Sequence, residues 1–198
     1  MKLLLCSDFK NVGYKYLNKY LDLSKHHTCL FVNYASDDYG NLEAEISSSM
    51  VRLQMLNFDI IELTENYDFS DKIDLIFVRG GNTTKLIDLL KENNQFEKIK
   101  QMVCDNTIYV GESAGSVLVG SDTEWTLRTE PYEIDLKQKY GKEVWLILNS
   151  PALCVWHFSC KNSATPQPHH TIAVVVHESS QQLHDEERNE VTTLRPHR

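Results

Sequence analysis

The chain lacks the features of membrane, disulfide-bonded and nucleic-acid-binding proteins. No apolar stretch approaches the roughly 20 residues of a transmembrane helix, and the run Leu3–Leu5 is too short for a signal peptide. The five cysteines are an odd number without the spacing of a disulfide scaffold, so we expect reduced thiols and a cytoplasmic protein. A net charge of -8 and a pI near 5.5 disfavour the broad positive surface that binds nucleic acid.

The composition is that of a globular protein. Of the 198 residues, 41% are hydrophobic and 24% are charged, far from the balance of a disordered chain. This length is sufficient to bury a sizeable core and short for two independent units. We therefore expect one domain over residues 1–198, in which the mostly polar stretch 177–198 is a surface tail or poorly ordered.

Apolar runs of strand length alternate with segments of helical periodicity. We predict strands at 2–7, 28–34, 60–63, 74–78, 107–110 and 171–176, and helices within 42–58 and 83–103. The second helical segment is expected to break near Asn93 and Asn94 and to be capped by Thr83 or Thr84. This alternation predicts an α/β fold, a three-layer, doubly wound, mostly parallel sheet.

A serine motif follows the predicted strand 107–110. The segment Gly111-Glu112-Ser113-Ala114-Gly115 has the G-x-S-x-G pattern and precedes a small-residue helix. Such a turn exposes a serine hydroxyl to a substrate carbonyl, and the N–H of Ala114 at the helix start can stabilise an oxyanion. A glycine-rich packing turn would give the same pattern, so the placement between strand and helix carries the catalytic interpretation.

A second glycine turn, Gly80-Gly81-Asn82-Thr83, also follows a strand and opens a helix. In a parallel sheet both turns emerge at the carboxyl edge, where ligands bind. The backbone N–H groups of Gly81 and Asn82 are therefore candidates to complete an oxyanion hole. The alternative is that the two glycines merely terminate the strand.

In this order, thirty residues apart, the two motifs resemble the paired signatures of peptidase family S51, the dipeptidase E and cyanophycinase-like serine peptidases. Residues 30–36 and 121–124 are also similar to that family, and the resemblance covers roughly residues 1–135. It implies a flavodoxin-like sheet related to class I glutamine amidotransferases, with serine in place of their cysteine. It also implies serine-type exopeptidase activity on small aspartyl or isoaspartyl peptides, with no cofactor and no metal.

The resemblance further implies a catalytic histidine and an acidic residue. Glu130 precedes a proline, seventeen positions after Ser113, as the family's acidic residue does, while Glu112 and Glu124 remain alternatives. The family's histidine lies about forty residues after the serine in a Pro-His-aromatic context. No histidine of this chain meets both conditions.

Two histidines are candidates for that position. His169 follows a proline but lies fifty-six residues after Ser113, whereas His157 lies forty-four residues after it among different neighbours. We prefer His169. The departure from the family pattern, together with the polar end of the chain, leaves open a catalytically inactive S51-like homologue that acts as a binding protein.

Three other classes fit the sequence less well. An α/β-hydrolase needs an upstream His-Gly oxyanion motif that is absent, and an amidotransferase-like or DJ-1-like enzyme needs cysteine at position 113. A metal-binding module is suggested by cysteines and histidines whose spacing matches no familiar zinc site, namely Cys154, His157, Cys160, His169 and His170.

The predicted partner is a small peptide, and we expect a monomer or a homodimer that contacts neither nucleic acid nor membrane. An aspartyl substrate needs a cation to pair with its carboxylate, which arginine binds through two hydrogen bonds. Arg128 and Arg79 flank the two motif turns and are the candidates, although either is equally compatible with a solvated surface position.

Overall fold

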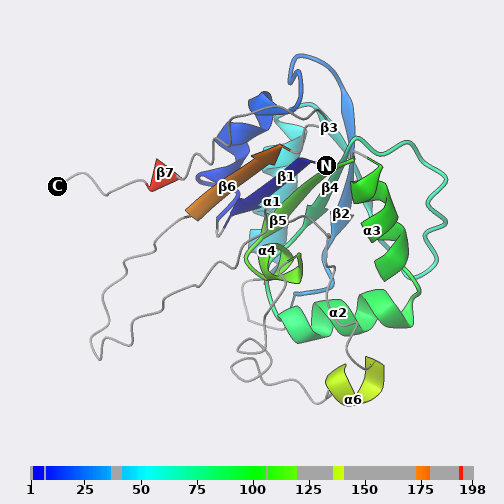
Figure 1. Ribbon diagram of the computed structural model, residues 1–198. Helices are drawn as coiled ribbons and strands as arrows, with labels where there is room; N and C mark the ends of the chain where they lie inside the picture. Colours follow the sequence, from blue (N-terminus) through cyan, green and yellow to red (C-terminus); the bar gives the residue numbers. More distant parts are fainter. Residues whose placement is uncertain are drawn as a thin grey trace, which may run out of the picture.

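A computed structural model describes residues 2–6, 8–36, 42–105, 107–119, 136–140, 173–178 and 192–193 of the chain. In this part a twisted sheet lies between two helical layers (Figure 1). The strands are β1 Lys2–Cys6, β2 His27–Val32, β3 Phe58–Glu62, β4 Leu75–Val78, β5 Ile108–Glu112, β6 Ala173–Glu178 and β7 Thr192–Thr193. The helices are the 3-10 helix η1 Gly13–Lys19, and α1 Leu42–Gln54, α2 Thr83–Glu92, α3 Phe96–Cys104, α4 Ala114–Leu118 and α6 Leu136–Tyr140.

The strand order is β3-β2-β4-β5-β1-β6-β7. The first five strands are parallel, whereas β6 runs antiparallel to β1 and β7 antiparallel to β6. Strands β3-β2-β4-β5 repeat the 2-1-3-4 order of flavodoxin-like sheets, with β1 beside β5. The predicted doubly wound, mostly parallel α/β sheet is confirmed. The order reverses between β2 and β4, and the carboxyl ends of the strands at such a point are where open α/β sheets generally bind their ligands.

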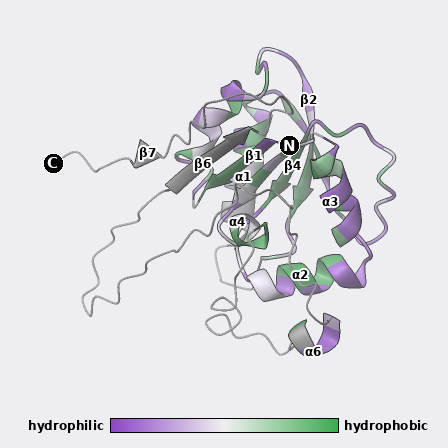
Figure 2. Ribbon diagram, in the orientation of Figure 1, coloured by the Kyte–Doolittle hydropathy of each residue, from purple (hydrophilic) through white to green (hydrophobic). Residues whose placement is uncertain are grey.

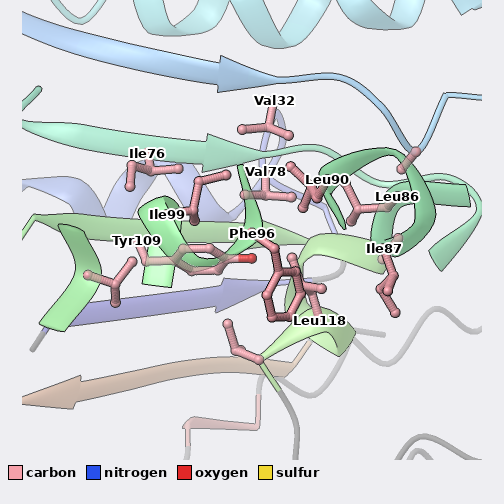
Figure 3. Close-up of a cluster of buried hydrophobic side chains, with 14 of the residues drawn as sticks. Val32, Ile76, Val78, Leu86, Ile87, Leu90, Phe96, Ile99, Tyr109 and Leu118 are labelled. Carbon is pink, nitrogen blue, oxygen red and sulfur yellow. The ribbon is translucent and has the colours of Figure 1, made fainter. Parts of the chain in front are cut away.

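Alternate residues of the central strands separate into two apolar layers. Leu3, Leu30, Val32, Ile76, Val78 and Tyr109 face α2, α3 and α4, whose side chains Leu86, Leu90, Phe96 and Leu118 cover them (Figure 3). The residues between them, including Leu4, Phe31, Phe77 and Val110, face η1 and α1. Because both faces are covered, these strands are continuously apolar in sequence, as Figure 2 shows for the centre of the sheet.

The N-cap of helix α2 lies one residue before the first predicted cap position. Asn82 has extended backbone angles, and its side-chain Oδ1 accepts a hydrogen bond from the Lys85 N–H at 2.9 Å. The prediction that Thr83 or Thr84 caps this helix is therefore wrong, because both are already helical and buried. The predicted break is confirmed between α2 and α3, where Asn94 has φ 55°.

Helix α6 is joined to α2 by a charged network. The Lys139 ammonium lies 2.7 Å from an Asp88 carboxylate oxygen and 2.6 Å from a Glu92 oxygen, and the Tyr140 hydroxyl donates to Asp88 at 2.8 Å. Asp88 is buried, so its charge needs these donors. Hydrogen bonds to Asp88 and Glu92 raise the pKa of Lys139. None of the helices described here is long and apolar enough to cross a bilayer.

Candidate active site

Three loops meet at the carboxyl edge of the sheet. They are residues 33–36 after β2, 79–82 after β4 and the turn at Ser113 after β5. The two glycine motifs touch, because a Cβ placed on Gly80 would lie 2.9 Å from the Ser113 Cβ and 3.6 Å from its Oγ. The structure thus brings together two motifs that are thirty residues apart in the chain.

Ser113 has a strained backbone conformation. Its φ of 48° with ψ of -107° lies outside the small left-handed region that non-glycine residues visit, at a cost of about 1–3 kcal/mol. Backbone hydrogen bonds hold this conformation. The Ser113 N–H donates to the Cys6 carbonyl at 2.9 Å, and the Ser113 carbonyl accepts the N–H groups of Ser116 and Val117 at 2.8 and 3.0 Å. The side chain is exposed. This is the geometry of a nucleophile elbow.

The motif glycines allow backbone to pack on backbone. A Cβ on Gly115 would lie 2.1 Å from the Val78 carbonyl oxygen, and a Cβ on Gly111 would lie 2.6 Å from Gly115 backbone atoms. The buried Tyr109 hydroxyl donates to the Gly115 carbonyl at 2.6 Å. Helix α4 is therefore fixed directly against the ends of β4 and β5, which sets the position of Ser113.

Ser116 joins the same helix to β1. Its hydroxyl oxygen accepts from the Cys6 N–H at 3.1 Å and lies 2.6 Å from the Gly111 carbonyl and 2.9 Å from the Cys6 carbonyl. With one hydrogen to donate, it serves one of these carbonyls at a time. No local pattern predicts this role for Ser116, because its contact with Cys6 spans 110 positions of the chain.

The Gly81 peptide lies against the loop after β2. Gly81 has φ 139°, and a Cβ there would lie 2.0 Å from the Ala35 carbonyl oxygen. That oxygen accepts the Asn82 N–H at 2.6 Å. Because its N–H is engaged in this hydrogen bond, Asn82 is a poorer candidate than Gly81 for the predicted oxyanion donor. Among the described residues the N–H groups of Gly81 and Ala114 have no hydrogen-bond partner.

Glu112 fixes the chain after β1 beside Ser113. Its carboxylate oxygen accepts the Phe9 N–H at 2.8 Å. Burial raises the pKa of Glu112, as does the nearby negative Asp8, whereas the Phe9 hydrogen bond and the positive charges of Arg79 and Lys10 lower it. This contact gives Glu112 a structural function, so Glu112 is a poorer candidate for the acid that orients a catalytic histidine.

Several predicted site residues lie outside the part of the chain that the structure describes: His169, His157, His170, Glu130, Glu124, Arg128, Cys154 and Cys160. Their assignments remain predictions. Within the described ranges no group of three metal-ligating side chains comes together. Arg79 is described and is buried beneath the site.

The described residues define an α/β protein that presents a strained serine at the carboxyl edge of a flavodoxin-like sheet. A profile of peptidase family S51 matches residues 3–150. The chain belongs to peptidase family S51.

Known proteins similar to this chain include peptidases E. Peptidase E of Haemophilus influenzae (strain PittGG) is 31% identical over 128 residues, 61% of this chain and 55% of that protein. Peptidase E of Pasteurella multocida (strain Pm70) is 26% identical over 127 residues, 61% of this chain and 54% of that protein. The chain thus aligns with about half the length of these relatives.

A solved structure is similar as well. The 1.5 Å crystal structure of a candidate peptidase E from Listeria monocytogenes EGD-e has a TM-score of 0.55 and 26% identity, covering 70% of this chain and 68% of that one. This similarity agrees with the flavodoxin-like strand order described above.

The close approach of α4 to β4 makes Gly115 sensitive to a single methyl group. We expect Gly115→Ala to lower the free energy of unfolding by about 1–3 kcal/mol or more, because the Val78 carbonyl is part of the sheet and cannot retreat. Ser113→Ala, which removes an exposed hydroxyl two positions away, is the matched control and should unfold like wild type. Urea unfolding of both variants measures the difference, and equal midpoints would contradict this packing.

The raised pKa of Glu112 predicts a pH dependence of stability. The native state binds this proton more readily than the unfolded chain, so the contribution of Glu112 is fully present below the ordinary glutamate pKa. It is lost as the pH rises through the raised pKa. Relative to Glu112→Gln, which keeps a carbonyl for the Phe9 N–H, wild type should therefore lose stability from mildly acidic to neutral pH. Parallel urea midpoints across this range would contradict the assignment.

Proposed function

We propose that this chain is a serine-type exopeptidase that hydrolyses small aspartyl or isoaspartyl peptides, with Ser113 as the nucleophile. The observation that carries the proposal is the conformation of Ser113. Its side chain is exposed, and its backbone is held at φ 48° between β5 and α4, in contact with Gly80. A fold tolerates such strain where the position of one hydroxyl matters.

The reaction follows the general course of serine hydrolases. Ser113 Oγ attacks the scissile carbonyl while a histidine takes its proton and then delivers that proton to the leaving amine. The N–H groups of Gly81 and Ala114 stabilise the oxyanion, for which both are available among the described residues. We assign the histidine to His169, with His157 as the alternative, and the orienting acid to Glu130. A water molecule, deprotonated by the same histidine, then attacks the Ser113 ester, which releases the acid product and returns the proton to Oγ.

Substrate selection requires a positive charge near the peptide. In this proposal Arg128 pairs with the substrate carboxylate, because a guanidinium binds a carboxylate through two parallel hydrogen bonds. Arg79 is less suited to direct contact, since only 6% of it is exposed and its guanidinium donates to the Ser36 hydroxyl.

Location and assembly form a separate part of the proposal. We place the protein in the cytoplasm, as a monomer or a homodimer. Cys6, Cys29 and Cys104 are free thiols, which supports a reducing compartment. Burial raises the pKa of Cys6 and of Cys29, so both remain unreactive thiols in the core.

A second candidate function is peptide binding without hydrolysis. The spacing of the histidines favours it, since His157 and His169 lie forty-four and fifty-six residues after Ser113 instead of about forty. Such a protein would keep the peptide site at the carboxyl edge and lack turnover.

Hydrolysis of a panel of Asp-X and isoaspartyl dipeptides distinguishes the two functions. We expect turnover by wild type and a loss of at least about 10³-fold in Ser113→Ala. Ser24→Ala changes an exposed serine at the opposite edge of the sheet and should keep the wild-type rate. A Ser113→Ala variant that retains turnover would overturn the nucleophile assignment. Binding of a dipeptide by calorimetry without turnover in folded wild type would favour the binding protein.

A further inference from the structure

The loop after β2 is held by three donors from the segment that carries the glycine turn. The Asn82 N–H donates to the Ala35 carbonyl at 2.6 Å. The Arg79 guanidinium donates to the Ser36 hydroxyl at 2.6 Å, and the Lys85 ammonium to the Ser36 carbonyl at 2.6 Å. Two cations and one backbone group of residues 79–85 thus bind residues 35–36, more than forty positions earlier in the chain.

This loop is the surface on which Gly81 rests. A Cβ on Gly81 would lie 2.0 Å from the Ala35 oxygen and 3.1 Å from the Ala35 Cβ, so the Gly81 backbone packs closely against the loop. On the other side of the turn, Gly80 contacts the Ser113 side chain. The position of Ala35 therefore limits the orientations of the Gly81 peptide relative to Ser113.

Arg79 is the buried member of this set. Only 6% of its surface is exposed, and its Nη1 also lies 3.5 Å from the Asn33 side-chain oxygen. The same side-chain oxygen of Asn33 accepts a hydrogen bond from the Ser36 hydroxyl, and the backbone carbonyl of Asn33 accepts the Ser36 N–H at 3.2 Å. A buried guanidinium is retained only with hydrogen-bond acceptors, and its planar fork fixes their directions.

We propose that Arg79 is a positioning residue, whose guanidinium holds the loop 33–36 against Gly81 and thereby orients the Gly81 N–H toward the oxyanion. Lys85 supports the same loop from the first turn of α2. The inference rests on the proposed function, which assigns the oxyanion to Gly81. Arg79 acts through Ser36 and Ala35 and does not touch the substrate.

The role predicts a specific kinetic effect. Because a misplaced oxyanion donor weakens stabilisation of the transition state and leaves substrate binding intact, Ser36→Ala should lower kcat by about 10 to 100-fold with little change in KM. Arg79→Ala should have a similar effect, and Arg79→Lys should recover part of the rate. Once Ser36 is alanine, further loss of Arg79 should add little, since the two residues act in one chain of contacts.

Amide hydrogen exchange tests the same inference without relying on turnover. In Ser36→Ala and Arg79→Ala the Asn82 amide, which donates to Ala35, should exchange at least about tenfold faster than in wild type. The amides of Leu4 and Val110 in the central strands should be unchanged, which separates local loosening from global unfolding. Lys19→Ala, a surface change on η1 at the opposite face of the sheet, is the matched control.

The outcomes are distinct. Unchanged Asn82 exchange in both variants would overturn the inference, and so would a rise in KM for acidic peptides with kcat unchanged, which would make Arg79 a substrate ligand. Failure of wild type to turn over any peptide through Ser113 would refute the proposed function alone. Asn82 exchange would then still decide whether Arg79 holds the loop.

Discussion

The contact between the backbone of α4 and the end of β4 is the constraint on which the site depends. Gly115 lies so close to the Val78 carbonyl that no side chain fits between them, and the Tyr109 hydroxyl binds the Gly115 carbonyl from within the core. With α4 held in this way, the chain leaving β5 has no room for a relaxed turn, and Ser113 takes up the strained conformation. Packing in the core thereby stabilises the backbone conformation that exposes the Ser113 hydroxyl.

The remainder of the edge is organised around this serine. Gly80, which follows β4, contacts Ser113, and the next residue, Gly81, packs on Ala35 in the loop after β2. Glu112 accepts a hydrogen bond from Phe9, which follows β1. All these loops follow parallel strands at the carboxyl edge, next to the point where the strand order reverses. Groups from several strands thus lie around Ser113, which is how such sheets assemble a site from separate segments of the chain.

The sequence predicted the parallel core and both motif turns because these depend on local patterns. Continuous apolar runs mark strands covered on both faces, and glycines mark close backbone contacts. Prediction from the sequence failed for features that depend on tertiary contacts. The cap of α2 is Asn82 and not a threonine, because the packing of the turn on Ala35 sets the first helical residue. Arg79 binds Ser36, which lies forty-three positions earlier in the chain, and no local pattern connects the two residues. The assignments of the catalytic histidine and of the acidic residue remain predictions.

The measurement that tests the central claim most directly is reaction of the folded protein with a fluorophosphonate, followed by mass spectrometry to locate the modified residue. An activated Ser113 should be labelled while Ser24 and Ser70, both exposed, are not, and unfolding in urea should abolish the labelling. No label on Ser113 in folded protein, or the same label after unfolding, would contradict the claim that this fold activates the serine.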